Sequence, residues 1–89
     1  MPDAPLIRFD RSFFLTSKHL PENLGARLRE TVAALARDWP NLPGPDDRET
    51  RLEPTSAVWL RRRVGASSWW LHYTPNDGGI IVRSVSDLG

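Results

Sequence analysis

The sequence predicts a small α+β domain of the order β-α-α-β-β-β, in which a helical hairpin covers one face of a small antiparallel sheet. Three observations predict this fold. Apolar residues recur at helical spacing over residues 22–39, apolar and aromatic runs suited to strands lie between residues 58 and 85, and an Asn-Asp-Gly-Gly segment separates the last two runs. A chain of 89 residues buries only about 60–65% of its unfolded surface, so we expect one domain over residues 1–89.

The N-terminal elements are a short strand and two helices. Residues 6–10 form an apolar and aromatic run that indicates a strand. Asp10 and Ser12 are both suitable N-caps for a helix over about residues 11–20, which Pro21 interrupts. The helix over residues 22–39 is the clearest prediction. Its apolar positions form one stripe, about every 3.5 residues: Leu24, Leu28, Thr31 or Val32, Leu35 and Trp39.

A long loop is predicted after the second helix. Residues 40–54 contain four prolines, which neither continue a helix nor fit a central strand. Loops of about fifteen residues in small domains are often functional. We expect Leu52 to pack the end of this loop against the core.

Three strands follow, over residues 58–64, 69–73 and 80–85. The Gly-Ala-Ser-Ser segment at residues 65–68 predicts the first turn. The Asn-Asp-Gly-Gly segment at residues 76–79 predicts the second, because Asn, Asp and Gly adopt the positive φ angles of tight hairpin turns.

The strand over residues 58–64 has a different character on each face. Side chains two residues apart in a strand point to the same face. If the aliphatic residues Val58, Leu60 and Val64 face the helices, then Arg61 and Arg63 lie on the opposite, open face. Trp59 lies there with them. The reverse register would bury two arginines instead of one. Even in the preferred register Arg62 faces the helices, so it must extend to solvent or form an ion pair.

The same alternation predicts the other strands. Trp70 and His72 should lie on the open face beside the arginines, whereas the hairpin register does not decide the face of Arg83. Trp69, Leu71 and Tyr73 should face the helices. The predicted core includes Leu24, Leu28, Leu35, Trp39, Leu60, Leu71 and either Ile81 or Val82.

The composition excludes several classes of protein. There are no cysteines and only two histidines, so disulfides and thiolate or histidine-rich metal sites are not expected, and neither is a cofactor. No apolar run approaches the length of a membrane span, and no signal-peptide core is present, so we expect a cytoplasmic protein with no membrane partner. The net charge of +1 implies no partner, but three adjacent arginines make a local anion site possible.

The predicted open face carries groups suited to RNA. Two guanidiniums about 7 Å apart on one strand suit a phosphate, although a solvated sheet face is the simpler interpretation. His72 is the open-face residue suited to acid–base chemistry, or else a packing residue. Trp59 and Trp70 could stack on bases; alternatively, one ring of the Trp69-Trp70 pair fills the core and the other covers a partner.

With these features the chain resembles the RelE/ParE toxin superfamily of bacterial type II toxin–antitoxin systems. The resemblance covers residues 6–87 and depends on the element order and on three segments: Phe-Asp-Arg-Ser-Phe at residues 9–13, Val-Trp-Leu-Arg-Arg-Arg-Val-Gly-Ala-Ser-Ser-Trp-Trp-Leu-His-Tyr at 58–73 and Gly-Ile-Ile-Val-Arg-Ser-Val at 79–85. The sequence departs from the family pattern at Trp70 and near Val85, where relatives carry arginines. It ends at Gly89, where many relatives continue into a tail with a catalytic Tyr or His.

The resemblance implies a toxin that blocks translation as a metal-independent, ribosome-dependent mRNA endonuclease. Its catalytic residues would be Arg61, Arg63 and His72, and Trp59, Trp70 and Arg83 would bind RNA or a partner. The implied partners are a cognate antitoxin, the ribosome and mRNA. The alternative is a binding protein without chemistry: a ParE-like gyrase inhibitor, a phage or mobile-element inhibitor of a host nucleoprotein complex, or an inactive partner of an antitoxin helix.

Overall fold

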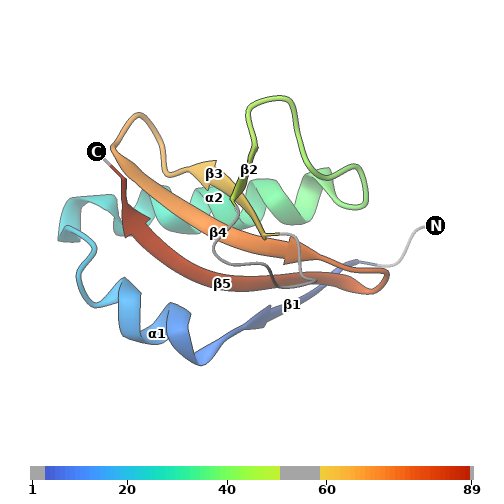
Figure 1. The fold of residues 1–89 in the computed structure, drawn as a ribbon, viewed down its shortest axis with the longest axis horizontal. Helices are drawn as coiled ribbons and strands as arrows, with labels where there is room; N and C mark the ends of the chain where they lie inside the picture. Colours follow the sequence, from blue (N-terminus) through green and yellow to red (C-terminus); the bar gives the residue numbers. More distant parts are fainter. Residues whose placement is uncertain (1–3, 51–58, 89) are drawn as a thin grey trace.

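The computed structural model describes residues 4–50 and 59–88, and within them two α-helices pack on a five-stranded sheet (Figure 1). The elements are β1 (Leu6–Phe9), α1 (Arg11–Ser17), a 3₁₀ turn (Glu22–Leu24), α2 (Gly25–Asp38), β2 (Arg48–Thr50), β3 (Trp59–Arg63), β4 (Trp69–Pro75) and β5 (Gly79–Asp87). The strand order across the sheet is β1-β5-β4-β3-β2. The predicted α+β class is confirmed. In these residues, no helix is both long and apolar enough to cross a bilayer.

The sheet differs from the prediction in two respects. It is mixed rather than wholly antiparallel, because β1 pairs in parallel with β5. It also gains β2, which lies inside the predicted loop of residues 40–54 and pairs with β3. Arg48–Thr50 contains no proline, so these residues can pair with the edge of β3. Leu52 and Val58, which we expected to contact the core, lie outside the described residues.

Gly79 lets β1 approach β5 closely. A side-chain carbon at this position would overlap the backbone of Leu6, whose amide donates to the Gly78 carbonyl at 2.9 Å. Only glycine leaves this space free.

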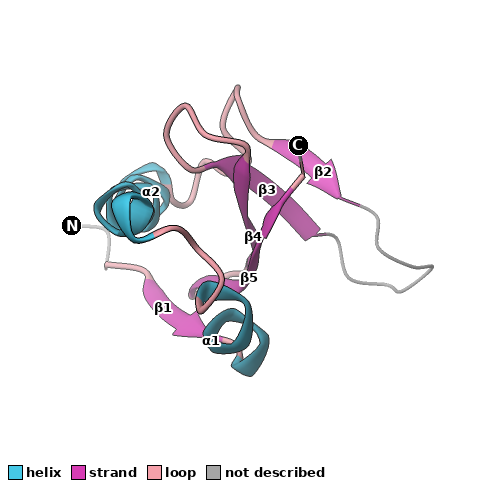
Figure 2. Cartoon of the chain, turned by 90° about the vertical axis from the view of Figure 1, so that its left-hand side faces the viewer, coloured by secondary structure: helices cyan, strands magenta, loops and turns pink. Residues whose placement is uncertain are grey.

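The helix α1 lies along β5 beyond the end of β1, an arrangement visible in Figures 1 and 2. The Ser12 hydroxyl donates to the Arg83 carbonyl at 2.6 Å, and the Thr16 hydroxyl accepts from the Val85 amide at 3.0 Å. These two hydroxyls take the place of a neighbouring strand at an edge that would otherwise expose its backbone groups. The helix ends at Ser17, three residues earlier than predicted. Neither Asp10 nor Ser12 caps it by a side-chain bond: Asp10 is the N-cap by position only, and its carboxylate instead binds Arg83.

The core lies between α2 and one face of the sheet. Leu35, Leu60 and Leu71 are buried as predicted, and Tyr73, which was expected only to face the helices, is buried with them. Leu24, Leu28 and Trp39 are only half-buried, because a small domain has too little mass to cover a whole helix stripe. The fully or almost fully buried residues are Leu35, Leu60, Val64, Leu71, Tyr73, Ile80, Val82 and Val85.

An irregularity in the pairing of β4 and β5 settles which residues of β5 face the core. The register shifts between His72 and Tyr73, so that His72 pairs with Ser84 and Tyr73 with Val82. The core positions therefore change from Ile80 and Val82 to Val85. Val82, and not Ile81, belongs to the core.

The turn between β4 and β5 forms at the predicted place by a different mechanism. Among the described residues the only positive φ is at Gly65, 61°, so the predicted positive φ angles at residues 76–79 are wrong. Instead the Asn76 side-chain oxygen accepts from the amides of Gly78 and Gly79, at 2.9 and 2.8 Å. The asparagine side chain thus closes the turn.

Candidate functional site

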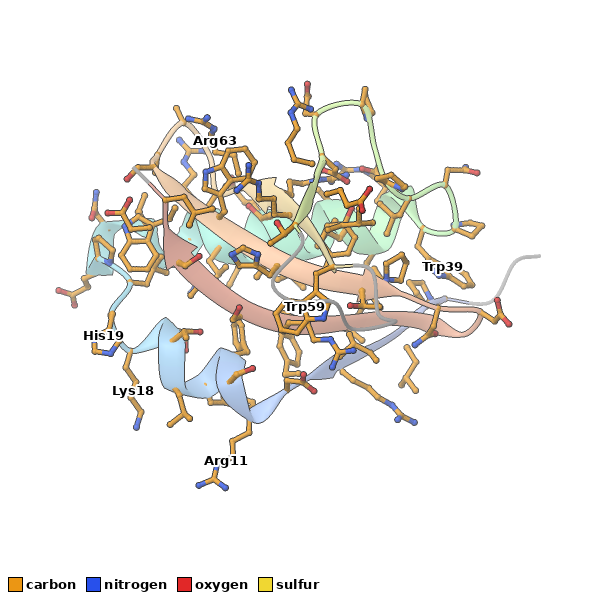
Figure 3. All side chains as sticks on the ribbon, viewed as in Figure 1. Arg11, Lys18, His19, Trp39, Trp59 and Arg63 are labelled. Carbon is orange, nitrogen blue, oxygen red and sulfur yellow. The ribbon has the colours of Figure 1, made fainter. Side chains whose placement is uncertain are left out.

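The face of the sheet turned away from α2, which we call the open face, carries Trp59, Arg61, Arg63, Trp70 and His72. Figure 3 looks onto this face, with Trp59 and Arg63 labelled. Across β3 and β4, Arg61 pairs with His72 and Arg63 with Trp70. These are five of the six side chains that the sequence analysis selected, and the sixth, Arg83, contacts Trp59 from β5.

Trp70 lies beside both arginines of the open face. The guanidinium carbons of Arg61 and Arg63 each lie 4.8 Å from the centroid of its ring. Cation–π contacts of this kind contribute about 0.5–1 kcal/mol at exposed sites. Both positive groups thus contact one aromatic ring.

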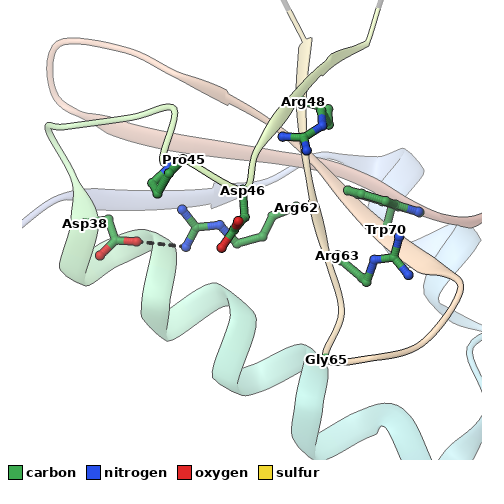
Figure 4. A pocket seen from close by; sticks show the side chains of 8 residues that line it. All are labelled: Asp38, Pro45, Asp46, Arg48, Arg62, Arg63, Gly65 and Trp70. Carbon is green, nitrogen blue, oxygen red and sulfur yellow. Dashed lines mark hydrogen bonds and ion pairs between the residues drawn. The ribbon is translucent and has the colours of Figure 1, made fainter.

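Arg48 is a third arginine at this site, and the sequence analysis missed it. In β2 it pairs with Arg61 across the sheet, and its side chain is exposed. A cavity of about 540 Å³ is lined by Arg48, Arg63 and Trp70, with carboxylates at Asp38 and Asp46 (Figure 4). The sequence predicts a loop at Arg48. Only the pairing of β2 with β3 places Arg48 next to Arg61.

His72 is buried within the open face. Only 4% of its surface is exposed, its Nε2 lies 2.7 Å from the Ser86 hydroxyl, and its ring centroid is 6.5 Å from that of Trp59. Burial, together with the positive charge of Arg61, lowers the pKa of His72 below its ordinary value. The imidazole is therefore neutral at neutral pH. Its Nδ1 has no hydrogen-bond partner among the described residues. This nitrogen is therefore not engaged in a hydrogen bond, but it is buried away from solvent.

Arg83 also lies toward the open face, a placement that follows from the register shift. Its guanidinium carbon is 5.3 Å from the centroid of Trp59, and its Nε donates to the Thr74 hydroxyl at 3.2 Å. It also forms an ion pair with Asp10 at 2.8 Å. Because a carboxylate already neutralises it, Arg83 is a weaker anion ligand than Arg61 or Arg63.

Arg62 points to the opposite face and forms a network of ion pairs and hydrogen bonds. The sequence predicted that Arg62 would extend to solvent or form an ion pair, but not which residue it would pair with. Its Nε and Nη2 contact the two oxygens of Asp47 at 2.6 and 3.0 Å, and its Nη1 contacts Asp38 at 2.9 Å. The Tyr73 hydroxyl also donates to Asp47, whose carboxylate is fully buried. Asp47 thereby anchors the segment before β2 and with it the adjacent Arg48.

The network has a defined charge state. Burial by itself would raise the pKa of Asp47, but hydrogen bonds from Arg62, Tyr73 and the Gly44 amide outweigh it and hold that pKa below the ordinary value. The bond to Asp47, opposed by burial, raises the pKa of Arg62. Burial and the bond to Asp47 raise the pKa of Tyr73. At neutral pH the network contains a carboxylate, a guanidinium and a neutral phenol.

The described residues contain no group of three or more His, Asp or Glu side chains placed to hold a metal ion. The polar groups of the open face are guanidiniums, one imidazole, two indoles and the hydroxyls that bond to them, those of Ser86 and Thr74.

Two solved structures are similar to this chain. One belongs to the archaeal RelE–RelB complex from Pyrococcus horikoshii OT3, with a TM-score of 0.67, 20% identity and coverage of 98% of both chains. The other belongs to the RelB–RelE antitoxin–toxin complex from Methanococcus jannaschii, with a TM-score of 0.62, 20% identity and coverage of 90% of this chain and 88% of that one. No protein-family profile and no curated protein matches the sequence. The likeness to the two complexes extends over nearly the whole chain, which therefore has the RelE fold.

Proposed function

We propose that this protein is the toxin of a type II toxin–antitoxin system and that it blocks translation by cleaving mRNA on the ribosome without a metal ion. The convergence of Arg61 and Arg63 on Trp70 carries this proposal. Two guanidiniums held on one rigid strand pair form a preorganised site for a phosphate, and Arg48 adds a third beside Arg63 in the cavity that both line with Trp70. The RelE fold supports it as an analogy.

In the proposed reaction the 2′-oxygen of the RNA attacks the adjacent phosphorus. His72, neutral because of its burial, accepts the 2′-hydroxyl proton. Arg61 and Arg63 stabilise the charge that develops on the phosphate oxygens. The 5′-oxygen leaves with a proton from solvent. Trp59 and Trp70 stack on the flanking bases, which is worth about 1–3 kcal/mol per base, and Arg83 keeps Trp59 in place.

The proposed toxin has three partners, the ribosome, mRNA and an antitoxin. The toxin acts in the cytoplasm on ribosome-bound mRNA, and a cognate antitoxin neutralises it. Both similar structures are of RelE–RelB complexes, which supports an antitoxin as the first partner to seek.

A second function is favoured by the burial of His72. With 4% of its surface exposed, this histidine offers RNA almost no surface to contact. Exposed Arg beside Trp is typical of the residues that dominate protein interfaces. The alternative is therefore a binding protein without chemistry, which inhibits gyrase or another host nucleoprotein complex through the open face.

One experiment separates the two functions. The protein is expressed from an inducible promoter, transcripts are mapped by primer extension, and bound complexes are captured in parallel. The nuclease predicts cut transcripts that disappear in the double variant Arg61→Ala/Arg63→Ala and largely in His72→Ala. The matched control is Arg29→Ala, an exposed arginine of α2. Intact transcripts, together with a captured complex that is lost in the double variant but kept in His72→Ala, would establish the binding protein.

A further inference from the structure

We propose that Asp47 is a positioning residue, which fixes Arg48 beside Arg61 and Arg63 so that all three arginines contact the phosphates of one RNA strand. Asp47 itself does not touch the RNA, because its carboxylate is fully buried. This role rests on the proposed function and deepens it, since it explains how a short edge strand supplies the third cation of the RNA site.

Arg48 occupies a position that is unfavourable by itself. It lies directly opposite Arg61 in the pairing of β2 with β3, and it lines the cavity of Figure 4 together with Arg63 and Trp70. Like charges directly opposite each other on neighbouring strands destabilise a sheet. β2 has only three residues, and so short a strand at a sheet edge opens readily. A contact other than the pairing of β2 must therefore keep Arg48 in place.

Asp47 supplies that contact. Its carboxylate accepts from Nε and Nη2 of Arg62 at 2.6 and 3.0 Å. The Gly44 amide, at 2.8 Å, and the Tyr73 hydroxyl also donate to it. These bonds tie the residue before β2 to β3 and β4, the two strands beside it in the sheet. The main-chain carbonyl of Asp47 also accepts from Nη1 of Arg48 at 3.1 Å. The start of β2 and the Arg48 side chain thus both depend on Asp47.

The two contacts between these segments lie on opposite sides of the sheet. On the helix side the pair Asp47 and Arg62 attracts, and on the open face the pair Arg48 and Arg61 repels. A neutral residue at position 48 would make the edge more stable, so the arrangement does not serve stability alone. An unfavourable local choice that a buried ion pair offsets is expected at a functional site. A bound phosphate would remove the repulsion, because it attracts both guanidiniums.

The test measures what Arg48 contributes to binding with and without the Asp47 carboxylate. The probe is a fluorescent 2′-O-methyl oligonucleotide of about eight nucleotides, which lacks the hydroxyl needed for cleavage. Its binding to the full chain is followed by anisotropy at several salt concentrations. We expect Arg48→Ala to weaken binding about tenfold and to lower the slope of log affinity against log salt by about 0.7. In an Asp47→Asn background the same substitution should cost less than about twofold. Because Asp47→Asn changes the net charge, only the effect of Arg48→Ala within each background is compared.

Two further backgrounds separate positioning from a general loss of stability, with circular dichroism to show that each protein is folded. Ile80→Ala removes buried side chain from β5, which pairs with neither β2 nor β3. Arg48→Ala should still cost about tenfold there. Tyr73→Phe removes one donor to the Asp47 carboxylate and keeps the ion pair, so Arg48→Ala should cost about threefold. This background decides the matter if Asp47→Asn does not fold.

Three results would overturn the proposal. The first is an equal cost of Arg48→Ala in the wild type and in the folded Asp47 and Tyr73 variants. The second is an equally reduced cost in Ile80→Ala, which would assign the effect to stability. The third is a wild type that does not bind the probe, or binds it as well after Arg48→Ala. Failure of the nuclease is distinguishable, because intact transcripts beside the expected coupling would overturn cleavage and leave the positioning role in place.

Discussion

Arg62 and its two neighbours are the same residue type in consecutive positions of one strand, and the structure gives them opposite roles. Arg62 points toward the helix side and is held by Asp47 and Asp38. Arg61 and Arg63 point to the open face, where their shared neighbour is an aromatic ring. Strand alternation alone makes this division. It teaches that a run of like charge can supply a structural ion pair and a binding site at once.

Removal of the Asp47 charge should produce the largest effect. We expect Asp47→Asn to lower the free energy of unfolding by about 3 kcal/mol, because it leaves Arg62 half-buried without its main partner. Urea denaturation followed by circular dichroism measures this change. The control is Asp46→Asn, an exposed neighbour, expected to stay within about 0.5 kcal/mol. Equal effects of the two substitutions would show that the network contributes little stability.

Loss of Arg61 and Arg63, the open-face pair, should weaken RNA binding and leave the fold intact. We expect Arg61→Ala/Arg63→Ala to weaken binding of single-stranded RNA by about 2 kcal/mol or more. The slope of log affinity against log salt should also fall by about 0.7 for each lost phosphate contact. Titration at several salt concentrations measures both, with the exposed α2 arginines changed in Arg29→Ala/Arg37→Ala as the charge-matched control. An unchanged slope would mean that these arginines do not contact phosphate.

The burial of His72 predicts an acid-sensitive component of stability. Its pKa is lowered in the folded protein, so the unfolded chain takes up the proton first as the pH falls below about 6.5. Stability from this residue is complete above that pH and falls as the pH decreases toward the folded pKa, by at most about 1.4 kcal/mol per pH unit. The difference between wild type and His72→Gln, measured by denaturation at pH 7.5 and pH 5, should shrink at the lower pH. A difference independent of pH would mean that His72 titrates normally.

The smallest effect should come from Tyr73 at alkaline pH. Its pKa is raised by burial and by the bond to Asp47, so its contribution to stability is complete below about pH 10 and is lost as the pH rises through the folded value. Tyr73→Phe should lack this alkaline decline, while at pH 7 it loses about 1 kcal/mol with the hydrogen bond. Parallel thermal denaturation of both proteins at pH 8 and pH 10.5 tests this. The same alkaline decline in Tyr73→Phe would assign it to other groups.

Several parts of the fold could be predicted because they depend on local rules. The stripe from Leu24 to Trp39 identified the second helix, and alternation from Trp59 to Arg63 separated the two faces. The residues around Asn76 located the turn correctly, although the turn is closed by the Asn76 side chain and not by positive φ angles. These features depend on neighbours along the chain.

Other features depend on residues far apart in the sequence. No local pattern indicates that Arg48 lies opposite Arg61, that Asp47 would accept both Arg62 and Tyr73, or that a register shift would place Arg83 beside Trp59. The burial of His72 could not be predicted either, because it depends on the strands β3 and β5 that pair with β4 on either side.

By itself the sequence determined the α+β class, the order of its predicted elements and the side of the sheet on which Arg61, Arg63 and Trp70 lie, because backbone geometry and hydrophobic periodicity act within a few residues. Only the tertiary structure decided that Arg48 joins them, that Arg62 is neutralised and that Phe14 and Leu15 remain outside the core. Pairing register and burial depend on how distant segments meet, and the free energy of that packing is not present in any one segment.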